Sequence, residues 1–143
     1  MKKTKEYKIV EDNFSTAEEP AFEYLVSTTQ QGFYFNSFEN LTAKVPFNYS
    51  DWSNVLHLSE RTLQRYKKAH KKFDSIQAEK ILSITMLFNR GNEVFENAEN
   101  FQKWIELPNA ALGNKKPIDI MDNAFGIQMI NDELGRIEHG ILA

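Results

Sequence analysis

Apolar residues recur at helical spacing along most of this chain, and this spacing is the strongest constraint on its fold. Phe35, Phe38, Leu41 and Val45 follow one another three or four positions apart, and residues 127–137 repeat the pattern. Such spacing places apolar side chains on one face of a helix. No stretch alternates apolar and polar residues over more than a few positions. The sequence therefore predicts an all-α fold.

Capping and breaking residues set the expected helix boundaries, because Ser, Thr, Asp and Asn favour helix starts whereas Gly and Pro favour ends. The expected N-terminal ends of helices are Thr16, Ser50 or Asp51, Ser59, Asp74 or Ser75, and Asn97 or Asn100. Gly91 is expected to end a helix. The expected helices cover residues 16–31, 35–45, 51–56, 60–71, 75–91, 98–107, 117–122 and 127–139. With a seam at Gly91–Asn92, the chain divides into a flexible arm (1–15), an N-terminal domain (16–92) and a C-terminal domain (93–143).

The composition limits the class of protein. The chain has 143 residues, of which 41% are hydrophobic and eleven are Phe, so it can form a core. It has no Cys, which excludes disulfides and Cys-ligated zinc. No stretch approaches the 18 or so apolar residues of a membrane span. The cytoplasm is therefore the expected location.

The net charge of −3 hides an asymmetry along the chain. Residues 57–80 carry a charge of +4, and residues 91–143 carry −5. A basic patch on an acidic protein is the electrostatic pattern expected of a site for a polyanion. The basic residues of the first segment are Arg61, Arg65, Lys67, Lys68, Lys71, Lys72 and Lys80.

The segment 51–66 has the features of a helix-turn-helix. Two short helices are expected to meet at His57–Leu58, with Ser59 capping the second, so that its first turn is ordered. His57 stands where such turns often hold Gly, because the position can require a positive φ. The side chains expected to face DNA are those of Ser59, Glu60, Arg61, Gln64, Arg65 and Lys68. Arg and Gln are suited to reading guanine and adenine edges. The alternative interpretation is a basic helix face that is merely solvated.

Enzymatic activity is not predicted. There is no Cys nucleophile, no Gly-x-Ser-x-Gly and no Gly-rich phosphate loop. The histidines, His57, His70 and His139, are far apart in the sequence and form no metal-binding pair. No catalytic residue, metal site or cofactor is therefore expected.

The C-terminal third, taken with the segment Leu58–Arg65, resembles the Xre-type antitoxins of RES–Xre toxin–antitoxin pairs (the Xre/MbcA/ParS antitoxin family). The resemblance covers about residues 32–142. The elements that carry it are Trp104, Pro108-Asn109, Ala111-Leu112-Gly113, Pro117, Met121 (where Leu is usual), Gly126, Leu134, Arg136-Ile137 and His139-Gly140. Independently of the resemblance, helical spacing favours a core position for Trp104, Leu112, Ile118, Met121, Ile127 and Leu134.

The resemblance implies a function. In this family an N-terminal helix-turn-helix domain binds operator DNA, and a C-terminal domain binds a RES toxin that consumes NAD⁺ or uses it to modify a target. The antitoxin's C-terminal end packs over the toxin's NAD site. By position, that role falls on Arg136, His139, Gly140 and Ile141. The implied partners are a RES-domain toxin, operator DNA and, since a dimer doubles the DNA contacts, a second copy of the chain.

Two alternatives remain open at this point. The chain could be a one-component transcription regulator whose C-terminal third only dimerises, or a toxin-binding protein that has lost DNA binding. Asp132, Glu133 and Glu138 favour toxin binding if they complement a basic NAD pocket. If residues 93–143 form a separate domain, this fragment is expected to bind the toxin without the rest of the chain.

Overall fold

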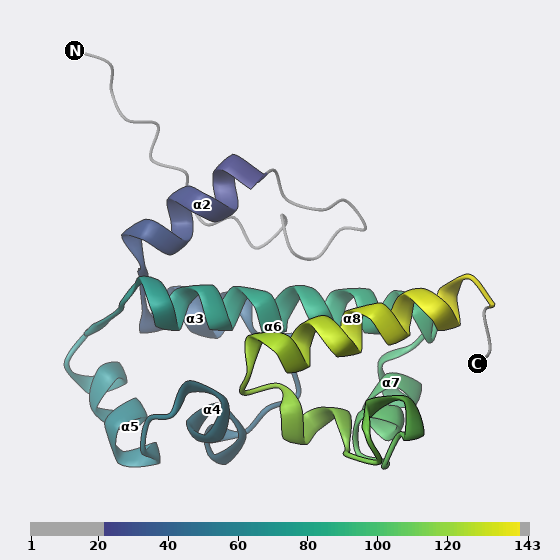
Figure 1. Ribbon diagram of the computed structural model, residues 1–143. Coiled ribbons are helices and arrows are strands. Elements are labelled where there is room, and N and C mark those ends of the chain that lie inside the picture. Colours follow the sequence, from purple (N-terminus) through teal and green to yellow (C-terminus); the bar gives the residue numbers. More distant parts are fainter. Residues whose placement is uncertain (1–21, 141–143) are drawn as a thin grey trace.

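The computed structural model describes residues 22–140, so the predicted arm, the predicted cap Thr16 and the predicted toxin contact Ile141 lie outside the described part (Figure 1). Helices dominate this part, as the all-α prediction requires. The elements are α2 (Phe22–Gln31), β1 (Phe33–Tyr34), α3 (Phe35–Leu41), α4 (Tyr49–Leu56), α5 (Glu60–Lys68), β2 (Lys72–Phe73), α6 (Ser75–Val94), α7 (Ala98–Ile105), the 3₁₀ turns η1 (Ala110–Leu112) and η2 (Pro117–Ile120), and α8 (Ala124–Glu138).

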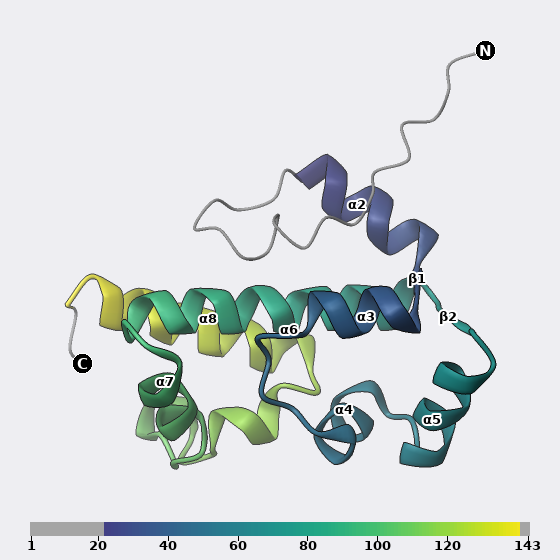
Figure 2. The same cartoon turned by 180° about the vertical axis from the view of Figure 1, so that it is seen from behind.

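The long helix α6 is the element around which the others are arranged. A capping box begins it: Asp74 accepts the backbone N–H of Gln77 at 2.8 Å, and Gln77 accepts that of Asp74 at 3.1 Å. α8 packs along α6, α2 lies on one side of α6, and α4 and α7 lie on the side opposite α2 (Figures 1 and 2). α8 runs in the same direction as α6, because Lys80 contacts Asp122 just before α8 begins and Arg90 pairs with Glu138 at its end.

The prediction that Gly91 ends a helix is wrong, because α6 continues through it to Val94. Gly91 is buried, and a Cβ atom there would lie 2.3 Å from the ring of Phe101 on α7. The glycine therefore allows a close aromatic contact, which outweighs the roughly 0.5–1 kcal/mol that Gly costs inside a helix. The predicted seam at residues 91–92 consequently falls within a helix.

Both parts of the chain contribute to one core. Buried apolar residues run without interruption from Tyr24 on α2 to Leu134 on α8, with α6 between them. Ile81, Ile84 and Leu87 of α6 are at most 1% exposed. The division of the chain at residue 92 stays a prediction, and the structure adds that α6 belongs to both parts.

An aromatic cluster forms the core of the N-terminal part. Phe73, completely buried, has its ring centroid 5.1 Å from that of Phe38 and 5.1 Å from that of Tyr66. Phe33 pairs with Phe73 in a small antiparallel sheet made by β1 and β2. The sequence did not predict this sheet, because two-residue strands are too short to show alternation.

Several helix ends differ from the predicted ones. α3 ends at Leu41 instead of Val45, although Val45 is still buried in the following turn. α5 ends at Lys68 instead of Lys71: His70 has a φ of 49°, and the N–H of Lys71 bonds the carbonyl of Tyr66 at 3.0 Å. This six-to-one hydrogen bond closes the helix and turns the chain into β2.

Some of the other helix caps and ends also differ from the predicted ones. α4 is capped by Asn48, whose side chain accepts the N–H of Asp51 at 2.8 Å, so Asp51 is the third residue of the helix and not its cap. α8 begins at Ala124, three residues before the prediction, and includes Gly126. Leu107 lies outside α7 and is 60% exposed. The predicted cap Ser59 is confirmed, and of the two alternatives at each of the next starts the structure selects Asp74 and Asn97.

The expected core positions of the C-terminal part are confirmed for most residues. Leu112, Met121, Ile127 and Leu134 are buried. Trp104 and Ile118 are only half-buried against the core.

Trp104→Ala should lower the free energy of unfolding by about 2–3 kcal/mol, toward the low end of the range for large core truncations. Trp104 packs against Phe95 and Phe101, with centroid distances of 5.5 and 6.1 Å, but its side chain is only half-buried. Urea denaturation measures the change. The exposed neighbour Lys103→Ala serves as control, and equal stability of the two variants would contradict the packing role of Trp104.

Candidate DNA- and toxin-binding surfaces

The turn between α4 and α5 has the geometry of a helix-turn-helix. His57 has a φ of 55° and a ψ of 38°, which is the left-handed conformation that Gly adopts most easily. Ser53 closes the turn, because its carbonyl accepts the N–H of Leu58 and its hydroxyl donates to the Leu58 carbonyl. The expectation of a positive φ at His57 is confirmed.

The first turn of α5 is fixed by its cap. The hydroxyl of Ser59 accepts the backbone N–H of Thr62 at 3.0 Å and lies 2.8 Å from the hydroxyl of Thr62. The inner face of α5 is buried through Leu63 and Tyr66, at 1% and 7% exposure. Ser59 therefore orders the helix start, and α5 is held in one orientation against the core.

The outer face of α5 carries the predicted DNA contacts on one surface. Glu60, Arg61, Gln64, Arg65 and Lys68 are all exposed. Among residues 22–140, none of the three cations in this set forms an ion pair with another side chain. A shallow hollow follows the helix and is lined by Arg61, Thr62, Gln64, Arg65, Lys68 and Ala69. We call the outward set of Arg61, Gln64, Arg65 and Lys68 the α5 basic face. Glu60 interacts favourably with the helix N-terminus but repels phosphate.

Two lysines that follow α5 in the chain each lie over an aromatic ring. The ammonium of Lys71 lies 5.1 Å from the ring centroid of Tyr66, and that of Lys72 lies 5.8 Å from the ring of Tyr34. These cation–π contacts restrict two flexible basic side chains in the segment after α5. The sequence could not place Tyr34 here, because the contact depends on the pairing of β1 with β2.

The predicted toxin contacts lie at the C-terminal end of α8. Arg136 and His139 are exposed, and Gly140 turns the chain with a φ of 67°. Arg136 donates to Glu133 at 2.8 Å, and Glu138 lies 4.0 Å from Arg90 on α6. The described residues of the predicted set thus share one end of the molecule.

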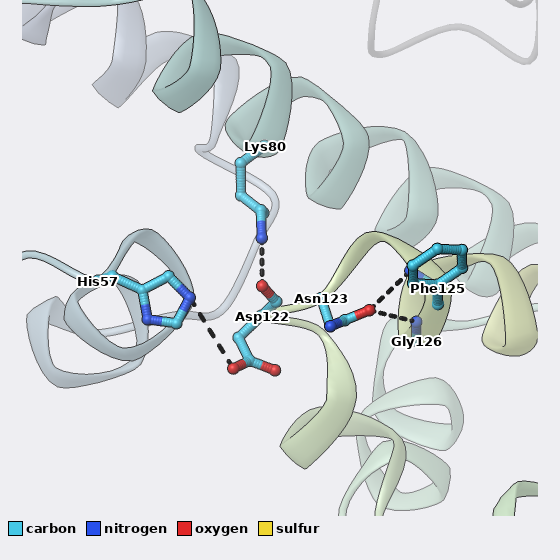
Figure 3. A network of polar contacts seen from close by, with 6 residues as sticks. All are labelled: His57, Lys80, Asp122, Asn123, Phe125 and Gly126. Carbon is cyan, nitrogen blue, oxygen red and sulfur yellow. Dashed lines mark hydrogen bonds and ion pairs between the residues drawn. The ribbon is translucent and has the colours of Figure 1, made fainter.

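A polar network joins the helix-turn-helix to the start of α8 (Figure 3). The imidazole Nε2 of His57 lies 3.9 Å from the carboxylate of Asp122, and Lys80 donates to the Asp122 carbonyl. Asn123 then caps α8 by accepting the N–H of Phe125 at 2.8 Å. The turn before the DNA-facing helix therefore contacts the C-terminal part directly.

Two antitoxin family models match this chain, one on each part. Residues 25–85 match the antitoxin Xre-like helix-turn-helix domain, which contains α5, and residues 90–140 match the antitoxin Xre/MbcA/ParS C-terminal toxin-binding domain, which contains α8. This chain belongs to the Xre-type antitoxins. It is accordingly the antitoxin of a toxin–antitoxin pair. A search of curated proteins found no match.

The two matches favour an antitoxin over a regulator whose C-terminal third only dimerises. They also confirm the resemblance to Xre-type antitoxins that the sequence shows. The boundary between the two matched regions lies on α6, because the helix-turn-helix match ends at residue 85 and the toxin-binding match begins at residue 90. Within residues 22–140 this antitoxin has no helix with the length and apolar character needed to cross a membrane.

Proposed function

We propose that this antitoxin neutralises a RES-domain toxin that consumes NAD⁺, and that it represses its own operon in the cytoplasm through α5. The observation that carries the DNA-binding part is the α5 basic face, exposed on a helix whose first turn is capped and whose inner side is buried. A helix presented in this way fits the major groove.

On DNA, each residue of the face has a distinct role. Arg61, Gln64 and Arg65 read base edges, because their side chains can form paired hydrogen bonds to guanine or adenine. Lys68 contacts phosphate and supplies affinity without sequence preference. Ser59 acts by ordering the first turn. A single α5 makes few contacts, so the repressor is a homodimer on two half-sites.

On the toxin side, the C-terminal end of the antitoxin covers the NAD pocket. The match to a toxin-binding domain supports an interface within residues 90–140, and the resemblance to antitoxins of RES toxins supports the choice of toxin. Arg136, His139, Gly140 and Ile141 form the blocking end. The acidic Asp132 and Glu138 on the same helix are exposed and complement a cationic pocket.

Deleting residues 136–143 should leave the complex intact but release much of the toxin's activity. The truncated α8 keeps Ile127, Ile130 and Leu134, which are buried against the core, although it loses the half-buried Ile137. The measurement is the cellular NAD⁺ level during co-expression with the RES toxin of the neighbouring gene. A melting scan of the purified truncated chain establishes that it folds.

Point variants sharpen this experiment. Arg136→Ala/His139→Ala should protect NAD⁺ less well than Gln102→Ala/Lys103→Ala, which changes exposed residues of α7 in the same part of the chain. If the truncated antitoxin protects NAD⁺ as fully as the complete chain, its C-terminal end does not block the active site.

A further inference from the structure

α8 presents a continuous exposed stripe on the side opposite its buried face. Phe125, Met129, Asp132 and Arg136 follow one another at spacings of four, three and four, so they share one face of the helix. All four are exposed, whereas Ile127, Ile130 and Leu134 point toward the core. We call these four residues the α8 stripe.

The N-terminal half of the stripe is apolar and unusually open. Phe125 is 78% exposed and Met129 is 44% exposed. An exposed Phe beside an exposed Met, one helical turn apart, is the type of surface that partner proteins cover. The remaining exposed large apolar residue among positions 90–140 is Leu107, which lies between α7 and η1.

The backbone that carries Phe125 is ordered before any partner binds. Asn123 accepts the N–H groups of Phe125 and Gly126, at 2.8 and 3.4 Å, so the first turn of α8 is ordered (Figure 3). Gly126 allows this turn to lie against η2, because a Cβ atom there would be 1.9 Å from the carbonyl oxygen of Ile120. An aromatic side chain has only two side-chain torsions, so on an ordered backbone it loses little conformational freedom on binding.

We propose that Phe125 and Met129 are the apolar anchor by which the antitoxin holds its toxin. This rests on the proposed function and extends it, because the toxin is then bound along the whole stripe and not only at the C-terminal end. The stripe leads from Phe125 to Arg136, where the proposed blocking end begins. Phe125 fills an apolar pocket of the toxin, and Asp132 faces a cationic side chain beside that pocket.

A second copy of this chain fits the stripe less well than the toxin does. Pairing two copies through α8 brings together two C-terminal parts that each carry a charge of −5 over residues 91–143. Juxtaposed like charges disfavour such an interface. Two apolar side chains are also far fewer than the core of an obligate homodimer needs.

Calorimetric titration of the purified full-length antitoxin with the purified RES toxin of the neighbouring gene tests the proposal. Phe125→Ala/Met129→Ala should weaken binding by roughly 30-fold or more, the effect expected of a hot spot. Leu107→Ala, which removes an equally open apolar side chain from the same part of the chain, should change the affinity by less than about threefold. Both variants should melt like the unchanged chain.

Each outcome decides between the possible occupants. Equal affinity of the double variant and the unchanged chain overturns the anchor but leaves the proposed function intact. A lower molecular mass of the free Phe125→Ala/Met129→Ala variant than of the free unchanged antitoxin, measured by light scattering, overturns the anchor too. The stripe would then join two copies of the antitoxin. If the unchanged chain does not bind the RES toxin, the proposed function and the anchor both fail.

Discussion

Arg61→Ala/Arg65→Ala should abolish binding of the antitoxin to the DNA upstream of its own reading frame. Each side chain is exposed on the α5 basic face, and neither forms an ion pair with another residue of the described range 22–140. A lost base contact costs roughly 1–3 kcal/mol, so the pair should cost about 2–6 kcal/mol. An electrophoretic shift at fixed salt measures this loss.

A matched control separates the loss of contacts made by α5 from the loss of net positive charge. Lys115→Ala/Lys116→Ala also removes two positive charges, but from exposed positions between η1 and η2. This variant should bind DNA nearly as the unchanged chain does, because its lysines are not on α5. If the Arg61→Ala/Arg65→Ala antitoxin still shifts the same DNA at the same concentration, α5 is not the recognition helix.

Leu63→Ala should lower the free energy of unfolding by about 2–5 kcal/mol, as expected for a buried Leu whose removal leaves a cavity. Leu63 is 1% exposed and lies on the inner face of α5. Urea denaturation measures the change through the transition midpoint. Since α5 is anchored by only Leu63 and Tyr66 among its buried residues, DNA binding should also weaken.

The control for this variant is Lys67→Ala, on the same helix and exposed. Its stability should differ from that of the unchanged chain by less than about 0.5 kcal/mol. If Leu63→Ala melts within a degree or two of the unchanged chain, the inner face of α5 does not contact the core as described.

Features that depend on neighbouring residues were predictable from the sequence. Ser59, Asp74 and Asn97 cap their helices as expected, because a cap is a hydrogen bond to a backbone N–H two or three residues away. The left-handed turn at His57 is likewise local. For the same reason the exposed face of α5 followed from helical spacing alone.

Features that depend on distant residues were not predictable in this way. Gly91 looks like a helix end in sequence, but the ring of Phe101 explains its presence within α6. The pairing of Phe33 with Phe73 joins residues that the pattern of apolar spacing does not connect. The exposure of Phe125 also escaped prediction, since an apolar residue near a helix start resembles a core residue until its neighbours are known.

The shared helix also sets how far the proposed blocking end stands from DNA. α6 has 20 residues and is therefore about 30 Å long, and α5 and the end of α8 lie at its opposite ends (Figure 1). Half-sites on DNA lie about 34–36 Å apart. Under the proposed function, the length of α6 therefore separates the blocking end, and with it the toxin's NAD site, from the DNA-facing helix by a distance close to one half-site spacing. The NAD site of the bound toxin and the operator then occupy opposite ends of one antitoxin, so closing the first does not cover the second.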